Sequence, residues 1–356
     1  MSGRAPVHGG FTAREAAERG LVWREVLDLS ANLAPLPTPP VLLEAARRAR
    51  LDRYPDPEYR ALREALGEFL SLPAESIVPG NGGAELIFVL ARLWLREGDR
   101  AAIVAPTFSE YERAAAACGA EVRAFWVAPG ELPVAEELVR RAELARAKLL
   151  FFCNPNNPTG WVLADLARLL ESAPPSLRIV VDEAYADFVP GYRSVAELAA
   201  GEARVAVVRS FTKCFALPGL RLGCAVAAPE VAEALRRLQP SWSINAVAEA
   251  VGRALPVARP HLDRVREEVE RAKGRLTEDL RRQGFDVVVG AANFVLLRVG
   301  EAARYRALLL DERVCVRDCT SFGLAEWVRV AVPPAHAVER TVRALVAARE
   351  RMEAGR

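Results

Sequence analysis

The segment that decides the fold is LLFFCNPNNPTG (149–160), in which a short apolar run ends abruptly in a polar turn. The same arrangement recurs in IVVDEAY (179–185) and in VAVVRSFTK (205–213). Short apolar runs bounded by turn residues are typical of buried strands. We therefore expect neighbouring strands with polar side chains at their carboxyl ends, which is where ligands bind in open parallel sheets.

Further apolar runs surround this segment, and each predicts another buried strand: AAIVA (101–105), VRAFWV (122–127) and CAVAA (224–228). Helical periodicity fills most of the intervals between the strands, at 85–96, 109–118 and 163–171. Alternating strands and helices predict an α/β domain of three layers, in which helices cover a mainly parallel sheet.

The pattern changes after Pro240. A long charged helix is expected at 259–283, and a smaller α+β unit should follow it. The strands predicted for that unit are 286–289, 294–299, 314–317 and 327–332, with a closing helix from Ala335. The Pro-rich start resembles an arm with one short helix. We therefore divide the chain into an N-terminal arm (1–40), a large domain (41–255) and a small C-terminal domain (256–356).

Composition argues against several classes of function. The 356 residues carry 48 basic and 46 acidic side chains, and a net charge of +2 is too small for non-specific nucleic-acid binding. No apolar run reaches the roughly 18 residues of a membrane-spanning helix, and the N-terminus lacks the apolar core of a signal peptide. The six cysteines and three histidines show no metal-binding spacing. We expect a soluble cytoplasmic protein without a metal site.

Amines are scarce, because the chain contains only the lysines Lys148, Lys213 and Lys273. Lys213 follows a predicted strand, whereas the other two are interpreted as solvated structural residues. Taken singly, NPNNPTG is a turn, Asp182 a helix N-cap and Lys213 a solvated loop residue. Taken together, they match pyridoxal phosphate, which needs an amine for a Schiff base and a carboxylate that keeps its ring nitrogen protonated. Lys213 and Asp182 are the candidates.

Other residues match the remaining needs of that cofactor. Tyr185 and Asn157 are candidate hydrogen-bond donors to its phenolic oxygen. The turn PGNGGAEL (79–86) places the backbone N–H groups of Gly83 and Ala84 at the start of a helix, where phosphate binds. Hydroxyl and guanidinium groups around Lys213 would complete the phosphate cradle: Ser210, Thr212 and Arg221. Phe108 either stacks on the cofactor ring or is an aromatic residue of the core.

The order of these motifs resembles the fold-type I pyridoxal-phosphate enzymes of the aspartate aminotransferase superfamily, over nearly the whole chain. The motifs are GNGGAE, PTFSEY, NPNNPTG, DEAY, SFTK, GLRLG and WVRVAV. The resemblance implies that Lys213 holds the cofactor and shuttles protons, and that Arg329 binds the substrate carboxylate. It also implies a homodimer with a composite site, in which Tyr54 reaches the phosphate of the partner's cofactor, although YPDPEY alone is equally a turn before a helix.

Two branches of that superfamily share most of these motifs: histidinol-phosphate aminotransferases and the L-threonine-O-3-phosphate decarboxylases of cobalamin biosynthesis. Four segments resemble the decarboxylases: HGG (8–10), LDLSANLAP (27–35), QPSWSIN (239–245) and VRDCTSFGL (316–324). The stretches TSFGL and LAP depart from that pattern. Decarboxylation of O-phospho-L-threonine to aminopropanol phosphate is therefore the expected reaction, and histidinol-phosphate transamination is the alternative.

Both substrates are phosphate monoesters, so the resemblance implies a second anion site, with Arg317, Asn32 and His8 as candidates beside Asn157 and Arg329. A disordered terminus is an equally good interpretation of His8. Two other classes of function fit less well. A transcription regulator of this type carries an N-terminal DNA-binding module, whereas the cofactor-domain pattern begins here by about residue 40. A nicotinamide dehydrogenase would show GxGxxG after its first strands.

Overall fold

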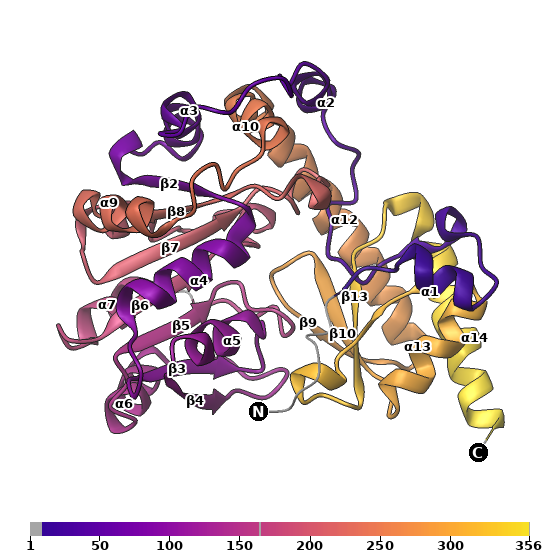
Figure 1. The fold of residues 1–356 in the computed structure, drawn as a ribbon. Coiled ribbons are helices and arrows are strands. Elements are labelled where there is room, and N and C mark those ends of the chain that lie inside the picture. The colour runs from indigo at the N-terminus through magenta and orange to yellow at the C-terminus, as the bar shows by residue number, and fades with distance from the viewer. Residues whose placement is uncertain (1–8, 164, 356) are drawn as a thin grey trace.

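A seven-stranded sheet forms the centre of the larger lobe in the computed structural model, which describes residues 9–163 and 165–355 (Figure 1). The strand order is β2-β8-β7-β6-β5-β3-β4. Its strands are β2 (Ile77–Gly80), β3 (Arg100–Ala105), β4 (Glu121–Trp126), β5 (Leu149–Cys153), β6 (Arg178–Asp182), β7 (Val205–Ser210) and β8 (Gly223–Ala227). Strands β3 to β7 run parallel, which confirms the expected α/β fold with a mainly parallel sheet.

Three details of the sheet differ from the sequence expectation. Strand β8 runs antiparallel to both of its neighbours, β7 and β2. Strand β2 was not expected, because its sequence IVPG contains a proline and a glycine and is too short for a periodic pattern. Strand β4 was expected to be buried, but its residues are exposed or half-buried because it is an edge strand that pairs only with β3.

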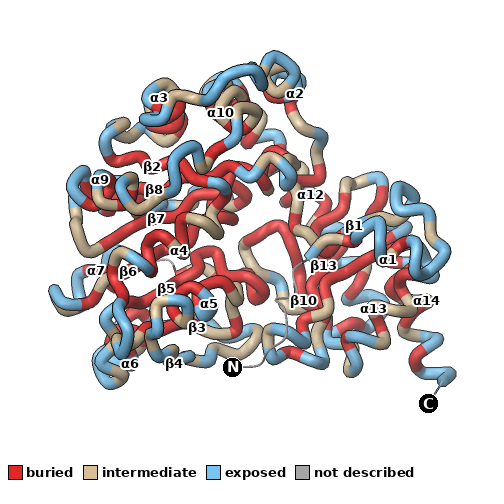
Figure 2. Tube along the Cα trace, in the orientation of Figure 1, coloured by how far each residue is buried: buried red, intermediate tan, exposed pale blue. Residues whose placement is uncertain are grey.

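Helices cover both faces of this sheet, which gives the expected three layers. Neighbouring strand residues point to opposite faces, so Phe151 packs in one apolar cluster and Phe152 in the other. On the Phe151 face lie α4 (Gly82–Trp94), α5 (Glu110–Ala117) and α9 (Pro229–Leu238). On the Phe152 face lie α6 (Ala135–Leu144), α7 (Leu166–Ser172) and α8 (Ala196–Gly201). Figure 2 shows the strands buried between helices with exposed outer faces.

The smaller lobe follows the long helix α12 (His261–Arg282) and holds a four-stranded antiparallel sheet in the order β12-β13-β10-β9. Its elements are β9 (Asp286–Val289), β10 (Phe294–Arg298), α13 (Ala302–Asp311), β12 (Arg317–Asp318), β13 (Trp327–Ala331) and α14 (Val338–Ala354). The strand expected at 314–317 is divided, because β11 (Val314–Cys315) pairs with the arm while β12 pairs with β13.

The N-terminal arm lies along the small lobe. It holds α1 (Ala13–Glu18) and β1 (Leu27–Asp28), and β1 pairs in parallel with β11. Arg306 of α13 donates to Glu15 of α1 at 2.5 and 2.9 Å, which fixes the arm further. The arm therefore contains a short strand besides the expected helix. The domain boundaries at residues 40 and 255 stay a prediction.

The remaining helices are short and mostly belong to the large lobe. They are α2 (Pro40–Arg47), α3 (Arg60–Leu70), α10 (Ala246–Arg253) and α11 (Leu255–Ala258), with 3-10 turns at Trp23–Glu25, Ala74–Ser76, Ala186–Phe188, Pro218–Leu220, Thr320–Phe322 and Ala335–Ala337. Within residues 9–163 and 165–355, no helix combines the length and apolarity needed to cross a membrane. The same residues hold no group of three or more side chains suited to a metal ion.

A buried charge network stabilises the end of the sheet. Arg209 of β7 is 6% exposed and donates to Glu183 at 3.3 Å and to Asp187 at 2.7 Å. Glu183 also accepts bonds from Ser194 at 2.5 Å and from the Val195 N–H at 3.0 Å. Removing one partner of such a buried ion pair leaves the other charges without compensation.

Arg209→Met should therefore lower the free energy of unfolding by about 3 to 5 kcal/mol, because two buried carboxylates lose their cation. Urea unfolding followed by circular dichroism measures this. Arg140→Met is the matched control: Arg140 binds Glu137 at 2.7 Å on the exposed face of α6, and its loss should leave the unfolding midpoint nearly unchanged. Equal midpoints for the two variants would contradict the assigned role of Arg209.

Candidate active site

The carboxyl ends of β5, β6 and β7 meet at one edge of the sheet. Cys153 is the register partner of Asp182, and Asp182 is the partner of Val208. The N–H of Asn154 donates to the Asp182 carbonyl at 2.9 Å, which keeps the polar turn beside the end of β6. The residues that follow Cys153, Asp182 and Val208 therefore lie side by side, as parallel strands require.

Lys213 lies within this group of segments and is half-buried. Its Nζ is 4.9 Å from the centroid of the Tyr185 ring. Nζ makes no hydrogen bond to another residue in the described part of the chain, unlike the other two lysines. Lys148 is paired with Asp99 at 2.7 Å, and Lys273 donates to three backbone carbonyls. The interpretation of Lys273 as solvated was wrong, because its ammonium is enclosed by a loop.

Asp182 is a buried carboxylate at the end of β6, with 5% of its surface exposed. Its Oδ2 accepts from the Tyr111 hydroxyl at 2.7 Å, and its Oδ1 accepts from the Ala184 N–H at 2.9 Å. Burial raises the pKa of Asp182, while the Tyr111 bond and the charge of Lys213 oppose that shift. Such a carboxylate fits a cationic ring nitrogen, because a nearby positive charge favours its ionised form.

Tyr111 was missed by reasoning from sequence. It lies on α5, is fully buried, and stacks on Phe151 with ring centroids 5.4 Å apart. The one available signal was its position in the motif PTFSEY, three residues after Phe108, which itself precedes the helix. Those two rings are in edge contact at 5.8 Å.

Tyr111→Phe should move the acidic limb of the pH dependence of kcat/KM to higher pH. The Tyr111 hydroxyl lowers the pKa of Asp182, so its removal keeps the carboxyl protonated up to a higher pH. Tyr305→Phe is the control, because it also removes a buried hydroxyl bond, to the Leu345 carbonyl at 2.6 Å, far from Asp182. Identical acidic limbs in both variants would refute the role of Tyr111.

Glycines, hydroxyls and a guanidinium that suit a phosphate come together where α4 begins. Gly82 has φ +76°, and a Cβ there would lie 2.5 Å from Nη2 of Arg221. The first N–H groups of the helix, at Gly83 and Ala84, have no acceptor within the helix and so suit an anion. The hydroxyls of Ser210 and Thr212 lie 3.0 Å apart and are both buried.

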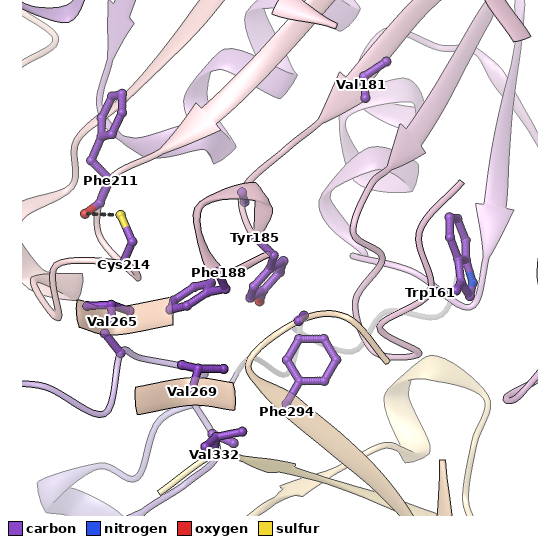
Figure 3. Close-up of a cluster of buried hydrophobic side chains, with 14 of the residues drawn as sticks. Trp161, Val181, Tyr185, Phe188, Phe211, Cys214, Val265, Val269, Phe294 and Val332 are labelled. Carbon is purple, nitrogen blue, oxygen red and sulfur yellow. Dashed lines mark hydrogen bonds between the residues drawn. The ribbon is translucent and has the colours of Figure 1, made fainter. Parts of the chain in front are cut away.

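Arg329 connects the two lobes at the site. It lies on β13, is 4% exposed, and donates from Nη2 to the Ser30 carbonyl at 2.6 Å. Its Nη1 donates to Oδ1 of Asn157, which links the polar turn 154–160 to β13. The guanidinium carbon is 5.3 Å from the centroid of the Phe294 ring. Figure 3 shows Phe294 and Tyr185 in one apolar cluster.

The arm contributes Asn32, which is fully buried with φ +55°. Its Nδ2 donates to the Tyr185 hydroxyl at 3.2 Å. In the described residues, Oδ1 of Asn32 and Nε of Arg329 are buried without a hydrogen-bond partner. Buried polar atoms without partners are costly, so these two atoms fit a site that is completed by a polar ligand.

Arg317 is the direct register partner of Arg329 across β12 and β13. It donates to the Ser321 hydroxyl at 2.6 Å, and its guanidinium carbon lies 5.3 Å from the centroid of the Phe322 ring. Burial, and then the charge of Arg329, lower the pKa of Arg317 to about 10. Two buried cations on adjacent strands favour an anionic ligand.

Tyr54, Phe108 and His8 complete the set of predicted residues. Tyr54 is 80% exposed, and its ring is 4.7 Å from that of Trp242. Phe108 is half-buried beside Tyr111. His8 lies outside the described residues.

The residues present fit pyridoxal phosphate by their chemistry. An amine, a buried carboxylate, an anion-binding helix start and a buried tyrosine hydroxyl are the groups that this cofactor requires. The Arg221 guanidinium approaches Gly82 so closely that a Cβ at residue 82 would overlap it.

Comparison with known proteins also indicates an enzyme that uses pyridoxal phosphate. Residues 24–348 match the model of the family "Aminotransferase class I and II". The histidinol-phosphate aminotransferase of Symbiobacterium thermophilum is 38% identical over 94% of this chain and 93% of its own, and the threonine-phosphate decarboxylase of Salmonella typhimurium is 34% identical over 95% of each. The fold matches the structure of histidinol-phosphate aminotransferase from Sinorhizobium meliloti in complex with pyridoxal-5'-phosphate, with TM-score 0.86, 23% identity and 96% of each chain covered. The chain therefore belongs to the aminotransferase class I and II family, and it is a pyridoxal 5'-phosphate-dependent enzyme of fold type I.

Proposed function

We propose that this enzyme removes CO2 from O-phospho-L-threonine and releases aminopropanol phosphate. One observation carries the proposal: described residues of three of the four segments with the decarboxylase-like pattern lie against Arg329 or against Ser30, whose carbonyl Arg329 binds. The Gly10 N–H donates to Ser30 Oγ at 2.7 Å, and a Cβ at Gly9 would overlap the Ser30 carbonyl. That carbonyl accepts from Arg329, and Arg317 lies opposite Arg329.

The two arginines suit a substrate with two anionic groups. Arg329, with Asn157, would hold the carboxylate, while Arg317, held by Ser321, would take the phosphate, with Asn32 and His8 as further candidate contacts. Fixing both ends of the substrate decides which bond at Cα stands perpendicular to the cofactor ring, and that bond breaks. When bound, the cofactor supplies the electron sink for that bond. Lys213 Nζ would then deliver the proton that replaces the carboxylate.

Histidinol-phosphate transamination is the second candidate, and the names of the relatives favour it. The relative with 38% identity is a histidinol-phosphate aminotransferase, against 34% for the decarboxylase of Salmonella typhimurium. In that reaction Lys213 Nζ would take the proton from Cα, and the arginines would hold a phosphate in one half-reaction and a dicarboxylate in the other.

One pair of assays on the purified holoenzyme separates the two candidates. With O-phospho-L-threonine, we expect stoichiometric CO2 and aminopropanol phosphate without any 2-oxo acid. With imidazole-acetol phosphate and glutamate, we expect no histidinol phosphate. Histidinol phosphate and 2-oxoglutarate as products, without CO2 from O-phospho-L-threonine, would overturn the decarboxylase proposal and establish the alternative.

We also propose a homodimer in which Tyr54 reaches the cofactor phosphate of the partner. The support is the exposure of Tyr54 together with Trp242 and Leu51, which are 80%, 44% and 79% exposed in the single chain. Sedimentation should give twice the chain mass, and Tyr54→Phe should weaken cofactor retention on dilution. A monomer that retains full activity would contradict this assignment.

A further inference from the structure

Lys273 of α12 holds the loop between β9 and β10, which is defined here as the brace loop (residues 290–293). Its Nζ donates to the carbonyls of Gly290, Ala291 and Ala292 at 3.1, 3.1 and 3.0 Å. An ammonium has three N–H donors and no acceptor, so its hydrogen-bonding capacity matches these three consecutive carbonyls. Burial lowers the pKa of Lys273, and the charge of Glu270 opposes that shift.

The brace loop is tied to the polar turn that carries Asn157. The Ala291 N–H donates to the Gly160 carbonyl at 2.7 Å. Gly290 packs so closely on Gly160 that a Cβ at either residue would crowd the backbone of the other. The brace loop therefore sets the position of the end of the 154–160 turn, whose Asn157 binds Arg329.

The brace loop also holds the arm. Asn293 Nδ2 donates to the carbonyls of Asn32 and Leu33 at 3.0 and 3.1 Å, and the Val332 N–H donates to the Asn293 carbonyl at 2.9 Å. In the same arm, two residues after Asn32, the Ala34 N–H donates to the Lys213 carbonyl at 2.9 Å. The brace loop thus contacts the segments that carry Asn32 and Arg329, and the arm in turn binds the backbone of Lys213.

We propose that Lys273 is a positioning residue whose ammonium acts as an internal cation for the brace loop and so aligns both walls of the active site. Without this ammonium, the three carbonyls that point toward it would repel each other and would lose their hydrogen-bond donor. Lys148 has no such role, because its single partner Asp99 is at the surface. The proposal rests on the proposed active site but not on which substrate the enzyme uses. Its test therefore measures the exchange of backbone amides and needs no substrate.

Amide hydrogen exchange of the holoenzyme tests the proposal without any substrate. In Lys273→Ala, exchange of the Ala291, Val332 and Ala34 amides should be about tenfold faster, because local opening loses the restraint of three bonds. Lys148→Ala is the matched control and should leave these amides unchanged. Propylammonium replaces the atoms removed from Lys273, so it should restore protection, whereas sodium chloride at equal ionic strength should not.

Unchanged exchange of these three amides in Lys273→Ala would overturn the proposal, as would equal acceleration in Lys148→Ala or failure of propylammonium to restore protection. If Lys273→Ala does not fold, Lys273→Gln takes its place, because an amide supplies two of the three donors. In Lys273→Gln the three amides should be protected to an intermediate degree. Protection equal to that of the wild type would refute the need for a cation. KM should rise more than kcat falls in both variants, whichever phosphorylated substrate proves correct.

Discussion

Lys213→Ala should abolish the visible absorbance of the covalently bound cofactor and lower turnover by orders of magnitude. We propose that its amine serves both covalent attachment and proton transfer, so one substitution should remove both. Neither remaining lysine can substitute, since Lys148 is paired with Asp99 and Lys273 is bound to three carbonyls. Absorbance spectra and single-turnover rates of the purified variant measure the effect.

Lys148→Ala serves as the control for that experiment, because it removes an amine without touching the site. It should keep both the absorbance and the rate of the parent enzyme. A Lys213→Ala protein that stays yellow after dialysis and turns over at the normal rate would show that the amine has been assigned to the wrong residue.

Asp182→Asn should lower kcat/KM by about a thousandfold while the protein still folds. The amide has the shape of the carboxylate and can still accept from Tyr111, so the change removes mainly the negative charge. Without that charge the ring nitrogen of the cofactor loses the partner that keeps it protonated, and the electron sink weakens. Steady-state kinetics and the absorbance of the bound cofactor report the loss.

Asp182→Glu and Asp99→Asn complete the comparison. The first restores a carboxylate and should recover part of the activity, while the second removes a charge from the surface pair with Lys148 and should have no effect on kcat/KM. Activity of Asp182→Asn within a factor of about two of the parent would exclude a catalytic need for this charge.

The sequence predicts the parallel strands well because their signal is local. The runs 149–153 and 179–181 are continuously apolar, and each ends at a polar residue that cannot continue a buried strand. Asp182, Asn157 and Lys213 are therefore placed near one another by strand order alone. The antiparallel β8 could not be anticipated, because an apolar run carries no information about its direction.

Contacts that depend on register or on helix packing were beyond sequence reasoning. The bond from Tyr111 to Asp182 joins residues 71 positions apart and exists only because α5 packs over that end of the sheet. Arg317 faces Arg329 because β12 and β13 pair in one register, and a slip by one residue would turn Arg317 to the other face. Lys273 lies in a charged helical pattern that indicates solvent, yet its ammonium binds three carbonyls of the β9–β10 loop.

The decisive measurement is reduction of the holoenzyme with borohydride, followed by proteolysis and mass spectrometry of the labelled peptide. We expect one pyridoxyl group per chain, attached to Lys213. A label on Lys148 or Lys273, or a reduced protein without any label, would contradict this expectation.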